Sequence, residues 1–184
     1  MLLIKHPTKN QEIRSSIEEF TIGEFEYLSS VINDSSRNHI DKWTEIFKFC
    51  GMDEEILDDM DSFDFIKLIG EFNVFEVKRT EIEKSIVLDD IFYFAYDEEF
   101  KISVKEMKII EGFIKDSQDK YIGDIMAVLY KRPDVDKNIT FDPSHIKYKA
   151  KLIRSQVNAS VCVPIINYIS KKLIKEVNIL DESN

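Results

Sequence analysis

The sequence contains few of the residues that usually mark a catalytic or metal-binding site. Its 184 residues include five glycines, two cysteines and three histidines. Neither a phosphate-binding glycine loop nor a Gly-x-Ser-x-Gly motif is present. No histidine stands at a recognisable spacing from either cysteine, although a nucleophilic thiol needs a nearby base. The residues therefore predict a protein that is not an enzyme and that binds no cofactor.

Long apolar runs and an excess of positive charge are also absent. No stretch approaches the ~18 consecutive apolar residues of a membrane span, and the apolar start from Met1 to Lys5 is too short for a signal peptide. The formal net charge of −10 argues against direct binding of nucleic acid, because the phosphate backbone attracts Lys and Arg. Cys50 and Cys162 both have apolar neighbours, which predicts buried thiols in a reducing compartment. We expect an intracellular protein without membrane contact.

Two acidic stretches are candidates for a metal site. One places an oxygen-bearing side chain at every second position, as the calcium loop of an EF-hand does: Asp134, Asp136, Asn138, Thr140 and Asp142. That loop also requires glycine at its sixth position and glutamate at its twelfth, where this chain has Ile139 and His145. The other stretch, Asp58 to Asp64, has no His or Cys near it in the sequence. We interpret both as solvated acidic segments and predict no metal site, with weak calcium binding at the first as the alternative.

The helical signal is strongest between Ser103 and Pro133. Ser103 and Glu106 have the spacing at which two residues cap a helix start reciprocally. Apolar residues then recur at helical spacing, stop at the polar run 116–119, and start again at Tyr121. The pattern predicts two amphipathic helices that lie antiparallel, because the turn between them is short.

An earlier segment repeats this pattern. A shift of 82 positions places Thr21–Glu24 on Ser103–Glu106 and Ile32 on Ile114, and the polar turns are also aligned. We interpret the agreement of cap, periodicity and turn as a structural duplication. The alternative is two unrelated helical hairpins, because caps and apolar stripes are common in helical proteins.

The segment between the two hairpins differs in composition. Residues 73–101 are rich in β-branched and aromatic side chains and alternate in part between polar and apolar, which predicts two or three antiparallel strands. The run Ile91–Tyr96 is expected to be a buried strand that packs on helices or on a neighbouring subunit. The predicted fold is mainly α with a small β element, in which a short antiparallel β segment joins two tandem helical-hairpin repeats. Its three parts are residues 1–72 with an N-terminal extended piece and the first repeat, the β-rich connector 73–101, and residues 102–184 with the second repeat and the C-terminal helices.

Positive charge gathers near the C-terminus. Asp142-Pro143 is a strong helix start, and a final helix is expected after Asn158. From Asp142 to Glu176 the chain has seven Lys or Arg against two acids, so this segment carries +5 and the rest carries −15. One side of the helix that starts at Asp142-Pro143 is expected to be basic and to attract the acidic surface of another copy or of a different protein. The alternative is that this side is a solvated face without a partner. The basic residues of that side are Lys147, Lys149, Lys151 and Arg154.

Four short phrases resemble small proteins encoded among the tail and neck genes of tailed bacteriophages, including crAss-like phages. They are AVLYKRP at 127–133, the lead-in at 91–100, ISVKE at 102–106 and VNASV at 157–161. Thr21–Glu24 looks like a first copy of the phrase that opens a helix in these proteins. The chain departs from their pattern at Lys131, which is inserted before Arg132-Pro133, and at 47–50, where FKFC stands in the place of LYKR.

The resemblance, which spans most of residues 18–170, implies a non-enzymatic structural or packaged virion protein of the tail or neck region, assembled in the host cytoplasm. Its expected partners are other phage structural proteins or copies of itself, contacted through the β segment and the basic C-terminal helices. A tail-assembly chaperone that leaves the particle and, outside phages, a bacterial helical adaptor domain are the alternatives. The residues expected at the contacts are Tyr130, Arg132, Lys147, Lys149, Lys151 and Arg154.

Overall fold

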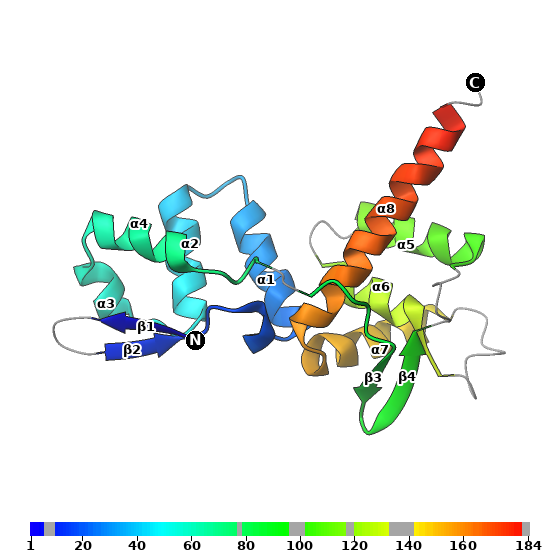
Figure 1. Cartoon of the computed structure of the whole chain (residues 1–184), viewed down its shortest axis with the longest axis horizontal. Helices are drawn as coiled ribbons and strands as arrows, with labels where there is room; N and C mark the ends of the chain where they lie inside the picture. The colour runs from blue at the N-terminus through cyan, green and yellow to red at the C-terminus, as the bar shows by residue number, and fades with distance from the viewer. Residues whose placement is uncertain (6–9, 77–78, 96–101, 117–119, 133–141, 182–184) are drawn as a thin grey trace.

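The computed structural model describes residues 1–5, 10–76, 79–95, 102–116, 120–132 and 142–181, with side chains up to Lys171 (Figure 1). The described residues form eight α-helices, two 3-10 helices and two small antiparallel sheets. The prediction of a mainly helical protein with antiparallel β structure is confirmed at this level. The helices and strands gather into an N-terminal lobe, which comprises the described part of residues 1–76, and a C-terminal lobe, which comprises that of residues 79–181 (Figure 1).

The N-terminal lobe combines a β-hairpin with four helices. Its strands pair antiparallel with Leu2 opposite Ile13, so the chain folds back on itself where the sequence predicts only one extended piece. Its elements are β1 (Leu2–Lys5), β2 (Asn10–Ile13), η1 (Ile17–Glu19), α1 (Ile22–Asn33), α2 (His39–Phe49), α3 (Glu54–Asp59) and α4 (Ser62–Glu71).

The C-terminal lobe packs a three-stranded sheet against helices. The sheet has the order β3-β4-β5, and its last strand is the pair Tyr130–Lys131, which the sequence places in the last turn of a helix. The helix ends at Leu129 instead, and the two residues pair with Phe94 and Ala95 of β4. The elements are β3 (Ser85–Leu88), β4 (Ile91–Ala95), α5 (Val104–Asp116), α6 (Ile122–Leu129), β5 (Tyr130–Lys131), α7 (Pro143–Gln156), η2 (Ala159–Val161) and α8 (Cys162–Asp181).

The expected helix caps form. Glu24 accepts the Thr21 backbone N–H at 2.8 Å while Thr21 accepts the Glu24 N–H at 3.3 Å. Ser103 and Glu106 make the same exchange at 2.7 and 3.3 Å. Asn158 accepts the Ser160 N–H at 2.9 Å, but it begins the short helix η2, from which α8 continues. These local bonds need only a few neighbouring residues, which is why the sequence predicts them.

Each lobe has its own hydrophobic core, and α1 contributes to both. Ile22 near the start of α1 lies in the C-terminal core, whereas Leu28 and Val31 lie in the N-terminal core. Phe25 of α1 and Val163 of α8 pack against both cores. The two lobes are therefore joined by packed side chains as well as by the chain itself.

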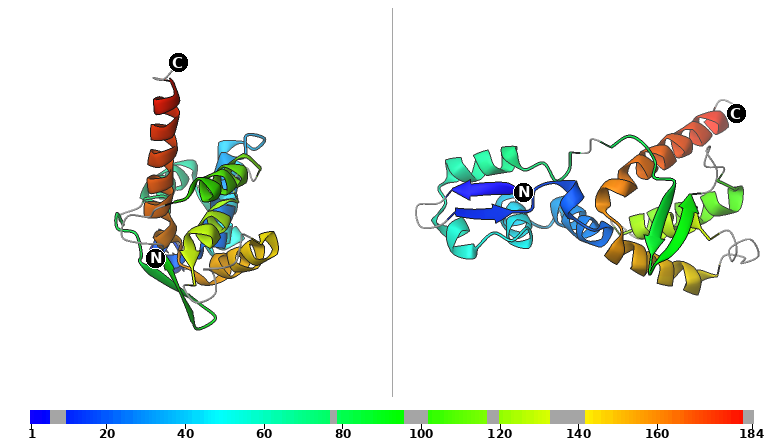
Figure 2. Two further views of the ribbon diagram at one scale, coloured as in Figure 1. Left: turned by 90° about the vertical axis from the view of Figure 1, so that its right-hand side faces the viewer. Right: turned by 60° about the horizontal axis from the view of Figure 1, so that its bottom comes forward.

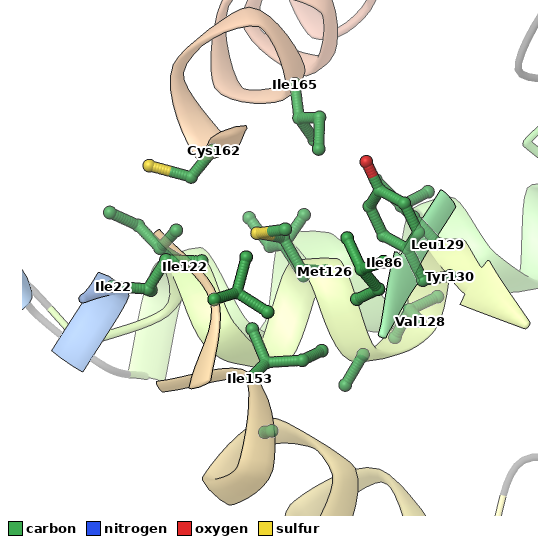
Figure 3. Close-up of a cluster of buried hydrophobic side chains, with 14 of the residues drawn as sticks. Ile22, Ile86, Ile122, Met126, Val128, Leu129, Tyr130, Ile153, Cys162 and Ile165 are labelled. Atoms are coloured by element: carbon green, nitrogen blue, oxygen red, sulfur yellow. The ribbon is translucent and has the colours of Figure 1, made fainter. Parts of the chain in front are cut away.

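The C-terminal core is built around α6, which is buried on nearly all sides. Ile122, Gly123 and every residue from Ile125 to Leu129 are buried, the pattern of a helix enclosed by other elements. Figure 3 shows α6 between Ile153 of α7 and the α8 residues Cys162 and Ile165. The strands of the expected connector 73–101 also belong to this core, through residues such as Ile86 and Tyr93.

The β3–β4 turn offers a first test. Asp89 and Asp90 have φ angles of 49° and 62°, in the left-handed region where glycine costs least. We expect Asp90→Gly to raise the free energy of unfolding by about 0.5–1 kcal/mol, measured by thermal unfolding followed by circular dichroism. Asp89→Gly is the control, because Asp89 also bonds the Gln156 amide through its side chain at 2.7 Å. A lower melting temperature for Asp90→Gly would contradict the expectation.

Candidate interaction surface

The outer face of the β3–β4 hairpin exposes large apolar side chains. Val87 is 46% exposed, Phe92 58% and Phe94 45%. Val87 lies opposite Phe92 in the ladder, and the Phe92 and Phe94 rings stack with centroids 6.3 Å apart. We call these three residues the aromatic face. Side chains alternate between the two faces of a strand, so a continuous apolar run such as Ile91–Ala95 places apolar groups on both faces.

The prediction of a buried strand at this place is wrong for most of its described residues. Of Ile91–Ala95 only Tyr93 is buried, at 9% exposure, and it lies in the C-terminal core with Ile86 and Leu88 of β3. Among the described residues, helices pack against the side of the sheet that holds Tyr93, and the sheet is antiparallel, a type that often has one free face. Periodicity cannot distinguish this arrangement from a strand covered on both sides.

On the core side of the sheet, opposite the aromatic face, polar contacts hold β4 and β5 in place. The Lys149 ammonium group donates to the Tyr130 carbonyl at 2.8 Å and lies 5.5 Å from the centre of the Tyr93 ring. The Tyr130 hydroxyl donates to the Glu83 carbonyl at 2.7 Å, and burial raises the pKa of Tyr130. These contacts fix β4 and β5 against α7, so the aromatic face sits on an ordered base.

An ion pair ties the sheet to α5. The Lys131 ammonium group contacts the buried carboxylate of Glu106 at the start of that helix. Burial favours the neutral form of Glu106, but hydrogen bonds from Lys131 and Ser103 outweigh this effect and lower its pKa. Glu106 is therefore charged at neutral pH and holds β5 close to α5.

The outer edge of β3 is open to another strand. The Ala95 N–H donates to the Lys84 carbonyl at 2.9 Å, so in an antiparallel ladder the backbone groups of Ser85 and Val87 point away from β4. Among the described residues no strand pairs with this edge. Unpaired backbone groups at a strand edge are the groups to which proteins add a strand from a partner.

The structure separates the six predicted contact residues. Tyr130 is fully buried, Lys149 is only 4% exposed, and Arg132 is half-buried. Lys147 and Lys151 are exposed on α7. The four basic residues of α7 do not share one exposed side, because this helix buries Ile146, Ala150 and Ile153 and takes Lys149 inside with them.

Arg154, the remaining predicted contact residue, holds the two lobes together. Its Nε donates to the buried carboxylate of Glu26 in α1 at 2.7 Å, and its terminal nitrogen contacts Asp124 of α6 and donates to the Lys120 carbonyl at 2.8 Å. Glu26 also accepts the Gly123 N–H at 3.0 Å. Burial would lower the pKa of Arg154, but its bonds to Glu26 and Asp124 outweigh burial and raise it.

Two glycines make room for this arginine. A Cβ atom at Gly123 would lie 2.8 Å from Cγ of Arg154, and one at Gly23 would lie 3.0 Å from its carbonyl oxygen. The ion pairs of Arg154 with Glu26 and Asp124 are not among the sequence predictions, although the position of Glu26 indicates a buried partner. Glu26 lies four residues after Ile22, on the apolar side of α1, where a charged residue needs a buried partner.

The described residues offer little support for a metal site or a reactive thiol. Asp134, Asp136 and Asn138 lie outside them, and Asp142 caps α7 by accepting the Ser144 N–H at 2.9 Å. Within the described ranges no three His, Cys, Asp or Glu residues are grouped to hold a metal ion. Both cysteines are free and buried, and burial raises the pKa of each thiol to about 12. At neutral pH they are therefore protonated and weakly nucleophilic.

Comparison with known proteins adds no family. No protein-family model, curated protein or solved structure matches the chain significantly. None of the helices, as far as the structure describes them, is long and apolar enough to cross a membrane.

Proposed function

We propose that the protein is a non-enzymatic structural or packaged component of the tail or neck region of a tailed bacteriophage. The support from the sequence is the resemblance of AVLYKRP, ISVKE and VNASV to proteins of such regions. The support from the structure is the aromatic face, because a soluble protein that exposes stacked phenylalanines on an ordered sheet gains most when a partner covers them.

The proposed mechanism is docking. A neighbouring tail or neck protein covers Val87, Phe92 and Phe94 and pairs with the open edge of β3. Burying aromatic side chains supplies most of the binding free energy in many interfaces, and a strand added to the sheet sets the orientation of the partner. The base formed by Tyr130 and Lys149 keeps the aromatic rings in place before binding, which lowers the entropy cost.

We also propose that the two helical hairpins arose by duplication. Helices α1 and α5 start at residues 22 and 104, at the 82-residue shift found in the sequence. Both starts carry a reciprocal cap, and each helix contacts the helix that follows it. The environments of the second helices differ, because α6 is enclosed on nearly all sides whereas α2 has several exposed residues.

The deciding experiment is quantitative mass spectrometry of purified particles of the phage that encodes the protein. A stoichiometric number of copies per particle is the expected result. Presence in infected cells without presence in particles would instead favour a tail-assembly chaperone. Purification of the chain from uninfected bacteria, as part of a host complex, would favour the adaptor domain.

Incorporation should depend on the aromatic face. We expect Phe92→Ser together with Phe94→Ser to lower the copy number per particle at least about tenfold in a complementation assay, because each buried aromatic anchor is worth on the order of 2 kcal/mol. Ile40→Ser on α2 removes an apolar side chain that is 65% exposed and serves as the control. Circular dichroism should show both variants folded. Equal incorporation of the double variant and the wild type would exclude the aromatic face as the contact.

A further inference from the structure

The charge of the chain is divided unequally between the lobes. Residues 1–76 carry 17 Asp or Glu against seven Lys or Arg, a net charge of −10, while residues 77–184 carry 18 of each and are neutral. Two N-terminal lobes therefore repel each other, whereas an N-terminal lobe and a basic surface attract. If the N-terminal lobe of one copy contacts another copy, electrostatic attraction favours contact with a basic part of the other copy's C-terminal lobe.

The N-terminal lobe presents an exposed apolar surface with an acidic border. On α4, Phe63 is 75% exposed and Ile66 is 68% exposed, and the two lie one helical turn apart. A Cβ atom at Gly70, one turn further on, would meet no atom within 4 Å, so the surface is open there. Around these residues the exposed carboxylates are those of Asp58, Asp59, Asp61, Asp64 and Glu71. One exposed cation, Lys67, also lies on this helix and pairs with Glu71 at 3.9 Å.

The C-terminal lobe presents the complementary surface on α7. Tyr148 is 59% exposed, and its neighbours Lys147 and Lys151 are exposed on the same side of the helix. From Ser144 to Gln156 the helix has no acidic residue. This surface has an aromatic anchor next to two positive charges. The α4 surface has an apolar centre with five carboxylates around it and one lysine, so its net charge is negative.

We propose that α4 of one copy binds α7 of another copy. This inference rests on the proposed function: the protein is proposed to act through protein–protein contacts, and a second copy of the chain is one of its partners. Tyr148 packs against Phe63 and Ile66 in the open space beside Gly70, and Lys147 and Lys151 face the acidic border. The views in Figures 1 and 2 place α4 at the outer end of the N-terminal lobe and α7 in the other lobe, so the two surfaces of one copy serve two different neighbours.

The contact is heterologous, because it joins two different surfaces. Each copy that binds through α4 keeps a free α7, and the next copy adds to it. Such contacts produce closed rings when the rotation between copies closes and open filaments when it does not. This mode of assembly also keeps the acidic N-terminal lobes apart, since each one meets a C-terminal lobe.

The test is the mass of the purified full chain in analytical ultracentrifugation, with two surface variants. Variant A is Phe63→Ser with Ile66→Ser, and variant B is Tyr148→Ser with Lys151→Glu. The wild type should grow from the 21.6 kDa monomer to larger species as concentration rises at low salt. The association constant should fall at least about tenfold at 0.5 M salt, where charges are screened beyond a few ångströms. Variants A and B alone should remain monomers.

Mixing the variants distinguishes a contact between α4 and α7 from a contact that joins two identical surfaces. Variant A keeps an intact α7 and variant B an intact α4, so an equimolar mixture should form a 1:1 dimer and nothing larger. Val104→Ser and Lys108→Glu change exposed residues of α5 and should associate as the wild type does.

Three outcomes would overturn the inference. They are a wild type that stays monomeric, a mixture of A and B that stays monomeric, and a variant that associates on its own. A monomeric wild type would also leave a foreign basic protein as the occupant of α4. None of these outcomes bears on the copy number in particles, so the proposed function fails or stands by a separate measurement.

Discussion

Replacing Arg154 by alanine should lower the free energy of unfolding by about 3–5 kcal/mol, the range seen when one partner of a buried ion pair is removed. The change leaves the buried carboxylate of Glu26 with the Gly123 N–H as its remaining bonded partner. It also removes the link from α7 to Asp124 and to the Lys120 carbonyl. Urea unfolding followed by far-ultraviolet circular dichroism measures the loss.

Two further variants show whether the ion pair is the cause. Lys108→Ala removes an exposed basic residue from α5 and should change the stability by less than about 0.5 kcal/mol. Glu26→Gln combined with Arg154→Met removes both charges and should recover a large part of the loss, because no unpaired buried charge remains. A loss below about 1 kcal/mol for Arg154→Ala would mean that water or another cation compensates Glu26.

Phe47→Ala should be similarly costly, at about 3–5 kcal/mol. Phe47 is fully buried in the N-terminal core, where its ring lies 5.6 Å from those of Trp43 and Phe65 and 5.4 Å from that of Phe72. The mutation leaves a cavity among three aromatic rings and removes the edge contacts with Phe65 and Phe72 and the tilted contact with Trp43. Because Trp43 is the single tryptophan of the chain, its fluorescence reports unfolding of this core.

The same experiment measures how strongly the lobes are coupled. Circular dichroism follows the helices of both lobes, so with tight coupling its midpoint in urea should move together with that of Trp43 fluorescence. Ile40→Ala changes an apolar residue of α2 that is 65% exposed and should shift neither midpoint by more than the equivalent of about 0.5 kcal/mol. If Phe47→Ala lowers the urea midpoint of Trp43 fluorescence but leaves a transition in circular dichroism at the wild-type midpoint, the C-terminal lobe is stable alone.

What the sequence predicts well is local. The reciprocal caps at Thr21 and Ser103, the start of α7 at Pro143 and the burial of both cysteines follow from residue types and short spacings. Each depends on residues within about one helical turn, or on the apolar character of immediate neighbours.

What the sequence does not predict depends on long-range packing. Tyr130 leaves the helix because β4, more than thirty residues earlier, offers its backbone a partner. Phe92 is exposed whereas the less hydrophobic Tyr93 is buried, because within the described part of the chain helices pack against the face of the sheet that holds Tyr93. For the same reason the basic residues of α7 divide between surface and interior, and charge alone does not tell which of them reach solvent.

The position of α1 also decides how the molecule can be divided. In chain order α1 belongs with residues 1–76, yet its first turn completes the core of the other half, through Ile22, and its Glu26 neutralises an arginine there. A fragment that ends at residue 76 would contain this turn. The remaining C-terminal fragment would have a cavity in place of Ile22, and the N-terminal fragment would have an unpaired carboxylate at Glu26. The two lobes are therefore packing units and not exchangeable modules, because separating them after residue 76 removes Ile22 and Glu26 from their partners in the C-terminal lobe.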